Sequence, residues 1–252
     1  MLLLHDAVLR LASLALILLA HGVASYFDVV KREIPDKVWV LGIASSLLTL
    51  YQVLISTDLG VRLLYAVDAM LGVVMFLLMF LFRFAGGADA KSILLVSLSL
   101  LPRPGENTLL TVLNLPVVAV TLNSLIGVAA YTVYVLLLNR ERFQVCEKLY
   151  MLRSLERLIL RLSAVCVTVR EVLENSHKLS PILGRRELRS LMVIEYRNEV
   201  LQELVREGLL RPEDHVLAVY YVPYIVCITV GLALYVVTRS SIVSFLAKYF
   251  LT

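Results

Sequence analysis

Long apolar runs constrain this chain more than any other feature of its sequence. A helix that crosses a bilayer needs about 20 predominantly apolar residues. Six apolar runs cover roughly residues 4–27, 37–55, 61–82, 89–101, 109–138 and 217–238. The chain is 60% hydrophobic with a mean hydropathy of +0.84, which excludes an ordinary soluble domain. We therefore predict an all-α membrane bundle of six transmembrane helices, and we expect the first run to be retained rather than cleaved as a signal peptide.

Charged residues gather between the fifth and sixth runs. We predict that residues 1–138 hold transmembrane helices 1–5, that residues 139–215 form a small cytoplasmic insertion, and that residues 216–252 hold helix 6 and a C-terminal tail. Apolar residues at helical spacing and the alternation Val165, Val167, Val169 indicate a mixed α/β or helical insertion. Because the insertion is placed in the cytoplasm, we expect Cys146 and Cys166 to be free thiols, unless the cell is a hyperthermophile.

Basic residues predict the orientation of the bundle. If the first helix runs from outside to inside, 19 of the 24 Lys and Arg residues fall on the cytoplasmic side. The other five are Arg10, Arg62, Arg103, Arg239 and Lys248. In this orientation the two aspartates Asp28 and Asp89 lie at the cytoplasmic ends of two different helices.

The fourth run is too short to cross a membrane unaided. Residues 89–101 make a helix of about 20 Å at 1.5 Å per residue, against a hydrocarbon core of about 30 Å. Gly86 and Gly87 precede it, and irregular backbone at membrane depth is tolerated only where it lines a protein-enclosed or wet cavity. The pattern therefore predicts that Asp89 lies at the floor of a recess.

Two carboxylates at matching depth indicate acid–base chemistry. A carboxylate near hydrocarbon is costly and is usually functional. Two that lie close together cannot both ionise, so one can take a proton from water while the other donates to a carbonyl oxygen. This is the chemistry of an aspartic protease. The alternative is that Asp28 and Asp89 are interfacial charges solvated at helix ends.

The residues around both aspartates resemble a known family. They are Ser25-Tyr26-Phe27-Asp28 with Ile34-Pro35-Asp36 downstream, Gly86-Gly87-Ala88-Asp89-Ala90-Lys91, and Val222-Pro223-Tyr224 before the last run. This arrangement resembles the archaeal preflagellin and type IV prepilin peptidases of the GxGD membrane aspartyl proteases. The resemblance implies a cell-membrane endopeptidase that removes class III leader peptides from flagellin-like or pilin-like precursors at the cytoplasmic face. It also implies that Asp28 and Asp89 are catalytic and that no cofactor or nucleic acid is involved.

One position departs from the family pattern, since Ala88 stands where GxGD has glycine. Alanine would be strained by about 1–2 kcal/mol if this position needed positive φ, and we favour the reading that only a small residue is required. Candidate substrate-binding residues are Gly86, Gly87, Lys91, Glu33 and Asp36. The four histidines are scattered without metal-ligand spacing, and we predict no metal site.

Asp68 supports a rival interpretation. It lies in the outer half of the third run, where we expect a structural role with a polar partner. With Asp28 and Asp89 it could instead line the path of a small proton- or cation-coupled transporter. We find no internal repeat of the kind such transporters carry. A third possibility is a non-catalytic assembly protein that acts through its insertion.

Overall fold

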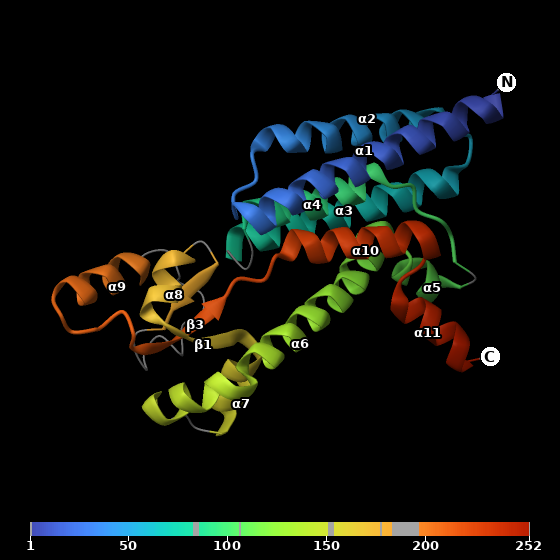
Figure 1. The fold of residues 1–252 in the computed structure, drawn as a ribbon. Coiled ribbons are helices and arrows are strands. Elements are labelled where there is room, and N and C mark those ends of the chain that lie inside the picture. The colour runs from blue at the N-terminus through green and yellow to red at the C-terminus, as the bar shows by residue number, and fades with distance from the viewer. Residues whose placement is uncertain are drawn as a thin grey trace. The chain divides into compact units, whose positions relative to one another are not determined.

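The structure is a computed structural model, and it describes residues 2–82, 86–105, 107–150, 154–176, 178–182 and 197–251. The chain is mostly helical and divides into two compact units (Figure 1). Unit 1 comprises Met1–Val128 and Pro223–Thr252, and unit 2 comprises Ala129–Val222.

Unit 1 is a bundle of apolar helices. Its elements are α1 (Leu2–Val30), η1 (Asp36–Val38), α2 (Trp39–Ile55), α3 (Leu59–Phe82), α4 (Gly87–Ser99), α5 (Thr108–Leu113), the first part of α6 (Pro116–Tyr150), α10 (Tyr224–Thr238) and α11 (Ile242–Leu251). Four segments are long and apolar enough to cross a membrane, namely Asp6–Val30, Asp36–Ile55, Leu59–Phe82 and Pro116–Arg140. Helix α10 is apolar but shorter. The chain is therefore a multi-pass membrane protein.

Helix α4 is the short helix that the sequence predicted, with 13 residues. It lies among α1, α3 and α10 in Figure 1, and most of its residues are buried. Its serines bond to the neighbouring helices: the Ser92 hydroxyl lies 2.8 Å from His21 Nε2, and the Ser99 carbonyl accepts a hydrogen bond from Thr49. These bonds compensate for placing polar groups inside an apolar bundle.

Two predicted runs need correction. The fifth is interrupted, because α5 ends at Leu113 and α6 begins at Pro116. Proline lacks an N–H and suits the first position of a helix, so Pro116 starts α6 rather than kinking it. The sixth was expected to be helical from residue 217, but His215–Tyr220 forms strand β3. A short apolar run does not by itself distinguish a strand from a helix.

Unit 2 packs helices with an antiparallel sheet. Besides the last part of α6 and strand β3, it contains α7 (Ser154–Ser163), β1 (Ala164–Thr168), α8 (Val169–Glu174), β2 (Leu179–Pro181) and α9 (Arg197–Arg206). The strand order is β1-β3-β2, and Cys166 faces Leu217 in the register. The alternating valines do predict β1, except that Val169 begins α8.

The cysteine prediction is wrong in this structure. Cys146 at the end of α6 and Cys166 in β1 form a disulfide across a sequence separation of 20 residues. Disulfides persist in oxidising compartments and in the intracellular proteins of hyperthermophiles. A cytoplasmic unit 2 is therefore consistent with this bond only in the hyperthermophile case.

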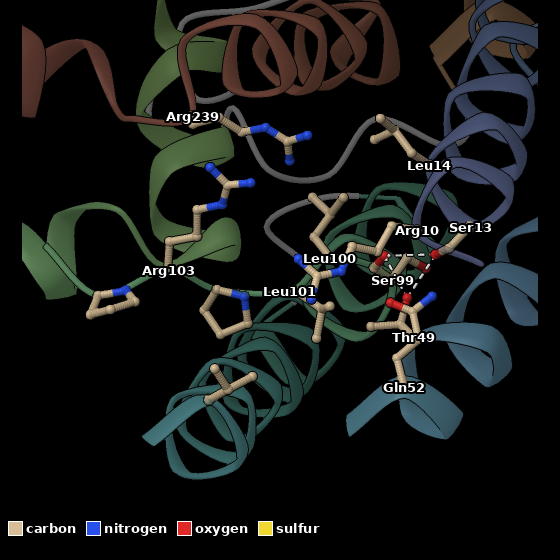
Figure 2. A pocket seen from close by; sticks show the side chains of 13 residues that line it. Arg10, Ser13, Leu14, Thr49, Gln52, Ser99, Leu100, Leu101, Arg103 and Arg239 are labelled. Atoms are coloured by element: carbon tan, nitrogen blue, oxygen red, sulfur yellow. Dashed lines mark hydrogen bonds between the residues drawn. The ribbon is translucent and has the colours of Figure 1, made fainter. Parts of the chain in front are cut away.

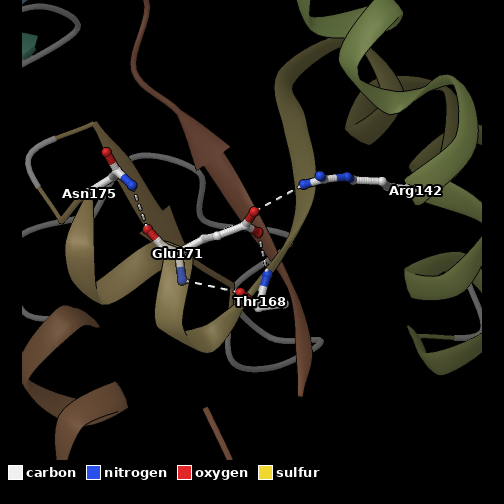
Figure 3. A network of polar contacts seen from close by, with 4 residues as sticks. All are labelled: Arg142, Thr168, Glu171 and Asn175. Atoms are coloured by element: carbon white, nitrogen blue, oxygen red, sulfur yellow. Dashed lines mark hydrogen bonds and ion pairs between the residues drawn. The ribbon is translucent and has the colours of Figure 1, made fainter. Parts of the chain in front are cut away.

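A capping box fixes the start of α8 (Figure 3). The Glu171 N–H donates to Thr168 Oγ1 at 3.2 Å, and the Thr168 N–H donates to Glu171 Oε2 at 2.9 Å. Arg142 adds an ion pair to Glu171 at 3.1 Å. The backbone hydrogen bond from Thr168, aided by Arg142, lowers the pKa of Glu171. The Thr-x-x-Glu spacing was a readable signal for this helix start.

Candidate active site

Asp28 lies in the last turn of α1, where it meets the beginning of α10. Its Oδ2 accepts a hydrogen bond from the Ile225 N–H at 3.1 Å. Pro223 is the N-cap residue of α10, so Ile225 belongs to the first turn, whose N–H groups have no partner within the helix. The positive end of a helix dipole favours a negative charge at this place.

Arg32 is a site residue that the sequence analysis counted only as a basic loop residue. Its guanidinium lies 3.6 Å from Asp28 Oδ1, and the two side chains are only 14% and 13% exposed. The backbone turns to allow this, since Arg32 has φ +57° and its N–H donates to the Phe27 carbonyl at 3.0 Å. Asp28 and Arg32 are spaced i, i+4, which was the available signal for the pair.

Asp89 is the third residue of α4 and bonds to the backbone just before the helix. Its Oδ2 accepts a hydrogen bond from the Gly86 N–H at 3.0 Å. Asp28 and Asp89 are close enough for their charges to interact, and Arg32 is within electrostatic range of both. Helices α1 and α4 thus bring the two predicted carboxylates to the same end of unit 1.

The backbone of residues 86–88 has no positive φ. Ala88 lies inside α4 and is not among the described residues with positive φ, so alanine is not strained here. Gly86 has φ −64° and ψ 155°, and a Cβ on Gly87 would meet nothing within 4 Å. Gly86 is thus extended backbone outside the helix, as expected, whereas Gly87 already belongs to α4. Gly87 leaves open space near the carboxylate, and a Cβ on Gly86 would lie 3.4 Å from Asp89 Oδ2.

The other candidate substrate residues fall into two groups. The Lys91 ammonium donates to Asp36 Oδ1 at 2.6 Å, so these two residues are partners of each other across α4 and η1. Glu33 is exposed in the loop between α1 and η1.

Two residues of α10 also reach this region: Tyr224, which belongs to the motif before the last apolar run, and Cys227, which the sequence analysis did not place at the site. Tyr224 lies within electrostatic range of Asp89, and Cys227 lies within range of both aspartates. Only the pairing of α1 with α10 in space reveals them, because nearly 200 residues separate them from Asp28.

Asp68 is separate from this site. It is fully buried, and its Oδ1 accepts a hydrogen bond from the Val117 N–H at 3.1 Å, in the first turn of α6. It precedes the end of α3 by fourteen residues, or about 21 Å at 1.5 Å per residue. The polar partner expected for Asp68 is thus a backbone N–H at the N-terminus of α6. This hydrogen bond connects α3 to α6.

The arrangement suits acid–base chemistry on water and a polarised carbonyl. Asp28 has a cation and the N-terminus of another helix beside it, whereas Asp89 lies in the first turn of its own helix and accepts a hydrogen bond from the Gly86 N–H. Unequal surroundings of this kind separate the protonation states of two neighbouring carboxyls. Among the described residues, no cluster of three or more His, Cys, Asp or Glu could hold a metal.

Comparison with known proteins supports the same interpretation. A search of curated proteins finds no match for this chain. The family model described as the type IV leader peptidase family matches residues 14–133, a stretch that contains both aspartate motifs. The family consists of membrane proteases that act on leader peptides, and the chain is such a protease in general terms. The resemblance noted in the sequence is thereby confirmed, since residues 14–133 match the type IV leader peptidase family.

Proposed function

We propose that this protein is an aspartic endopeptidase that cleaves the class III leader peptide of archaeal flagellin-like or pilin-like precursors at the cytoplasmic face. Asp28 and Asp89 are its catalytic pair, and α4 and α10 complete six spans with the four long helices. Residues 1–138 carry the pair, residues 139–215 form the cytoplasmic insertion, and residues 216–252 hold the last helix and tail.

The observation that carries the proposal is the meeting of Asp28 and Asp89 at one end of unit 1. They are 61 positions apart in the sequence and belong to different helices, yet their charges interact. A pair of solvated helix-end charges would need neither the buried Arg32 partner nor the bond to the start of α10.

The surroundings suggest a division of labour. Asp28, held between Arg32 and the α10 N-terminus, is the ionised carboxylate that takes a proton from the attacking water. Asp89 is the protonated partner that donates to the scissile carbonyl oxygen. Water is the nucleophile. When the tetrahedral gem-diol collapses, the proton held by Asp28 passes to the leaving amine, and a hydroxyl of the gem-diol returns a proton to Asp89, which restores the pair.

The loop that follows Asp28 recognises the basic residues of the leader peptide. Glu33 and Asp36 are exposed carboxylates close in sequence to the catalytic Asp28. Lys91 holds Asp36 and thereby fixes the loop against α4. Gly87, where an added Cβ would meet nothing within 4 Å, leaves room for the substrate backbone near Asp89, and Gly86 donates its N–H to that carboxylate.

Replacement of each aspartate tests the pair. Asp28→Asn and Asp89→Asn should each abolish cleavage of a pilin-type precursor, because an amide can serve neither as the base nor as the acid. The double variant should be no worse than either single variant, since the two groups act as a unit. Substantial turnover by either folded single variant would refute the assignment.

Labelling of introduced cysteines tests the cytoplasmic face separately. Thr57→Cys, in the loop between α2 and α3, should react with an impermeant thiol reagent in intact cells. Glu213→Cys in unit 2 should react only after permeabilisation. The opposite pattern would put the aspartates outside, where the Cys146–Cys166 disulfide is expected without a hyperthermophile host.

A further inference from the structure

A pocket opens at the end of unit 1 that is remote from the two aspartates (Figure 2). Its volume is about 160 Å³, and Arg10, Gln52, Arg103 and Arg239 are among its lining residues. Arg10 precedes Asp28 by eighteen residues of α1, or about 27 Å along the helix, close to the ~30 Å thickness of a hydrocarbon core. The pocket therefore lies at the opposite membrane boundary.

The charge of this pocket is one-sided. Its lining has three arginines and, within the described part of the chain, no acidic side chain. Asp6 already pairs with Arg10 at 2.8 Å. Arg103 and Arg239 also line a second pocket of about 380 Å³, together with the exposed Phe245. These two arginines are therefore shared by the two pockets.

The backbone fixes where the two arginines start. Arg239 is the C-cap residue of α10 in the left-handed conformation, with φ +56°, and its N–H donates to the Tyr235 carbonyl at 2.7 Å. Arg103 stands between Pro102 and Pro104, and proline restricts both its own φ and the residue before it. In Figure 2 the side chains of Arg103 and Arg239 both extend from the backbone into the pocket, whose lining they share.

Gln52 supplies an independent observation. Its side chain is 3% exposed and lines the same pocket, yet its Nε2 has no hydrogen-bond partner among the described residues. Neighbouring polar groups are satisfied: Ser13 Oγ lies 2.7 Å from Thr49 Oγ1, and Thr49 donates to the Ser99 carbonyl at 2.9 Å. A buried amide donor left over in this way points to an acceptor that the protein itself does not provide.

We propose that Arg103, Arg239 and Gln52 form a binding site for a phosphate-type anion, carried by a phospholipid headgroup or free in solution. Guanidinium groups bind phosphate oxygens through paired, charge-assisted hydrogen bonds, and the Gln52 amide adds a neutral donor from the buried side. A site at a membrane boundary can be reached by a lipid headgroup as well as by a free anion. The site is separate from peptide cleavage.

Binding to the purified full chain in uncharged detergent tests the proposal. The probes are inorganic phosphate, a short-chain phosphatidylglycerol, and a diacylglycerol of the same chain length that lacks phosphate. Affinity is measured by native mass spectrometry and by the ligand-induced rise in Tm. Arg103→Gln and Arg239→Gln should each weaken binding by at least roughly tenfold, as expected for the loss of one charge-assisted hydrogen bond.

Matched variants separate the site from general surface charge. Arg62→Gln is the control, because Arg62 is a basic residue of α3 that lines neither pocket and donates to the Leu54 carbonyl at 2.9 Å. It should bind like wild type, whereas Gln52→Leu should bind more weakly. Arg103→Lys, which keeps the charge but not the paired donors, should fall between wild type and Arg103→Gln.

The probes also distinguish the source of the phosphate. Binding of phosphatidylglycerol but not inorganic phosphate supports a lipid site, and binding of both supports a site for the anion itself. The proposal is overturned if the protein binds neither inorganic phosphate nor phosphatidylglycerol. So does equal binding of diacylglycerol, or a loss in Arg62→Gln as large as in Arg103→Gln.

Discussion

Gly231 lies where α10 packs closely against α6, and Gly231→Ala should disturb the site without replacing any of its residues. A Cβ on Gly231 would lie 2.5 Å from the Val120 carbonyl oxygen and 2.7 Å from the Ser124 backbone nitrogen. Both are backbone atoms of a helix, so no side chain can move aside. Restoring an ordinary 3.4 Å contact to the carbonyl oxygen requires a displacement of about 0.9 Å, the difference between 3.4 and 2.5 Å.

Two terms set the cost in stability. Overpacking of a core costs about 1–3 kcal/mol, and exchanging glycine for alanine within a helix returns about 0.8–1.0 kcal/mol. The net loss is therefore about 1 kcal/mol, rising to about 2 kcal/mol if the helices cannot relax. The catalytic cost should be larger, because α10 carries the Ile225 N–H that holds Asp28. A misplacement of about 1 Å can lower a rate roughly 100-fold.

The assay combines detergent-denaturant unfolding with initial rates of precursor cleavage. Gly22→Ala is the matched control, because a Cβ at Gly22 in α1 would meet nothing within 4 Å. We expect Gly22→Ala to keep wild-type activity and stability or to gain slightly in stability. If Gly231→Ala matches this control in both measurements, the close packing of α6 and α10, or its importance for Asp28, is refuted.

The carboxylates outside the proposed pair give two further predictions. Asp68→Asn should retain cleavage, because the amide oxygen of asparagine can still accept a hydrogen bond from the Val117 N–H and because position 68 lies far from Asp89 along α3. The check is the initial rate of cleavage by the folded variant. A loss of rate as large as that of Asp89→Asn would contradict this separation. Glu33→Gln combined with Asp36→Asn should raise KM for a basic precursor roughly a few-fold to tenfold, at about 0.2–1 kcal/mol for each exposed ion pair. Added salt should narrow this difference, and a wild-type KM at low salt would show that these carboxylates do not read the leader.

Local signals in the sequence predicted much of the site. The place of Asp89 in the first turn of a short helix followed from the length of one apolar run. Asp28 and Asp89 were predicted to share a depth because basic residues set the orientation of their helices. The first prediction depends on residues within one short segment, and the second on the distribution of charge along the chain.

Contacts between distant segments could not be predicted in this way. The bond from Ile225 to Asp28 and the Cys146–Cys166 disulfide depend on which helices and strands become neighbours. Strand β3 was taken for part of a helix because its apolar residues alone fit either structure. At Ala88 the question concerned the backbone conformation. The backbone of Ala88 is helical, so this position does not require the glycine that the family pattern has there.

The most direct test of the central claim is the mass of the products made by purified protein. The protein in detergent is incubated with a pilin-type precursor, alongside Asp28→Asn and Asp89→Asn. The account predicts two fragments from wild type, whose masses place the cut after the basic leader and before the hydrophobic segment, and intact precursor from both variants. Folded wild-type protein that leaves the precursor intact would contradict the account. So would a cut within the hydrophobic segment, or correct cleavage by either variant.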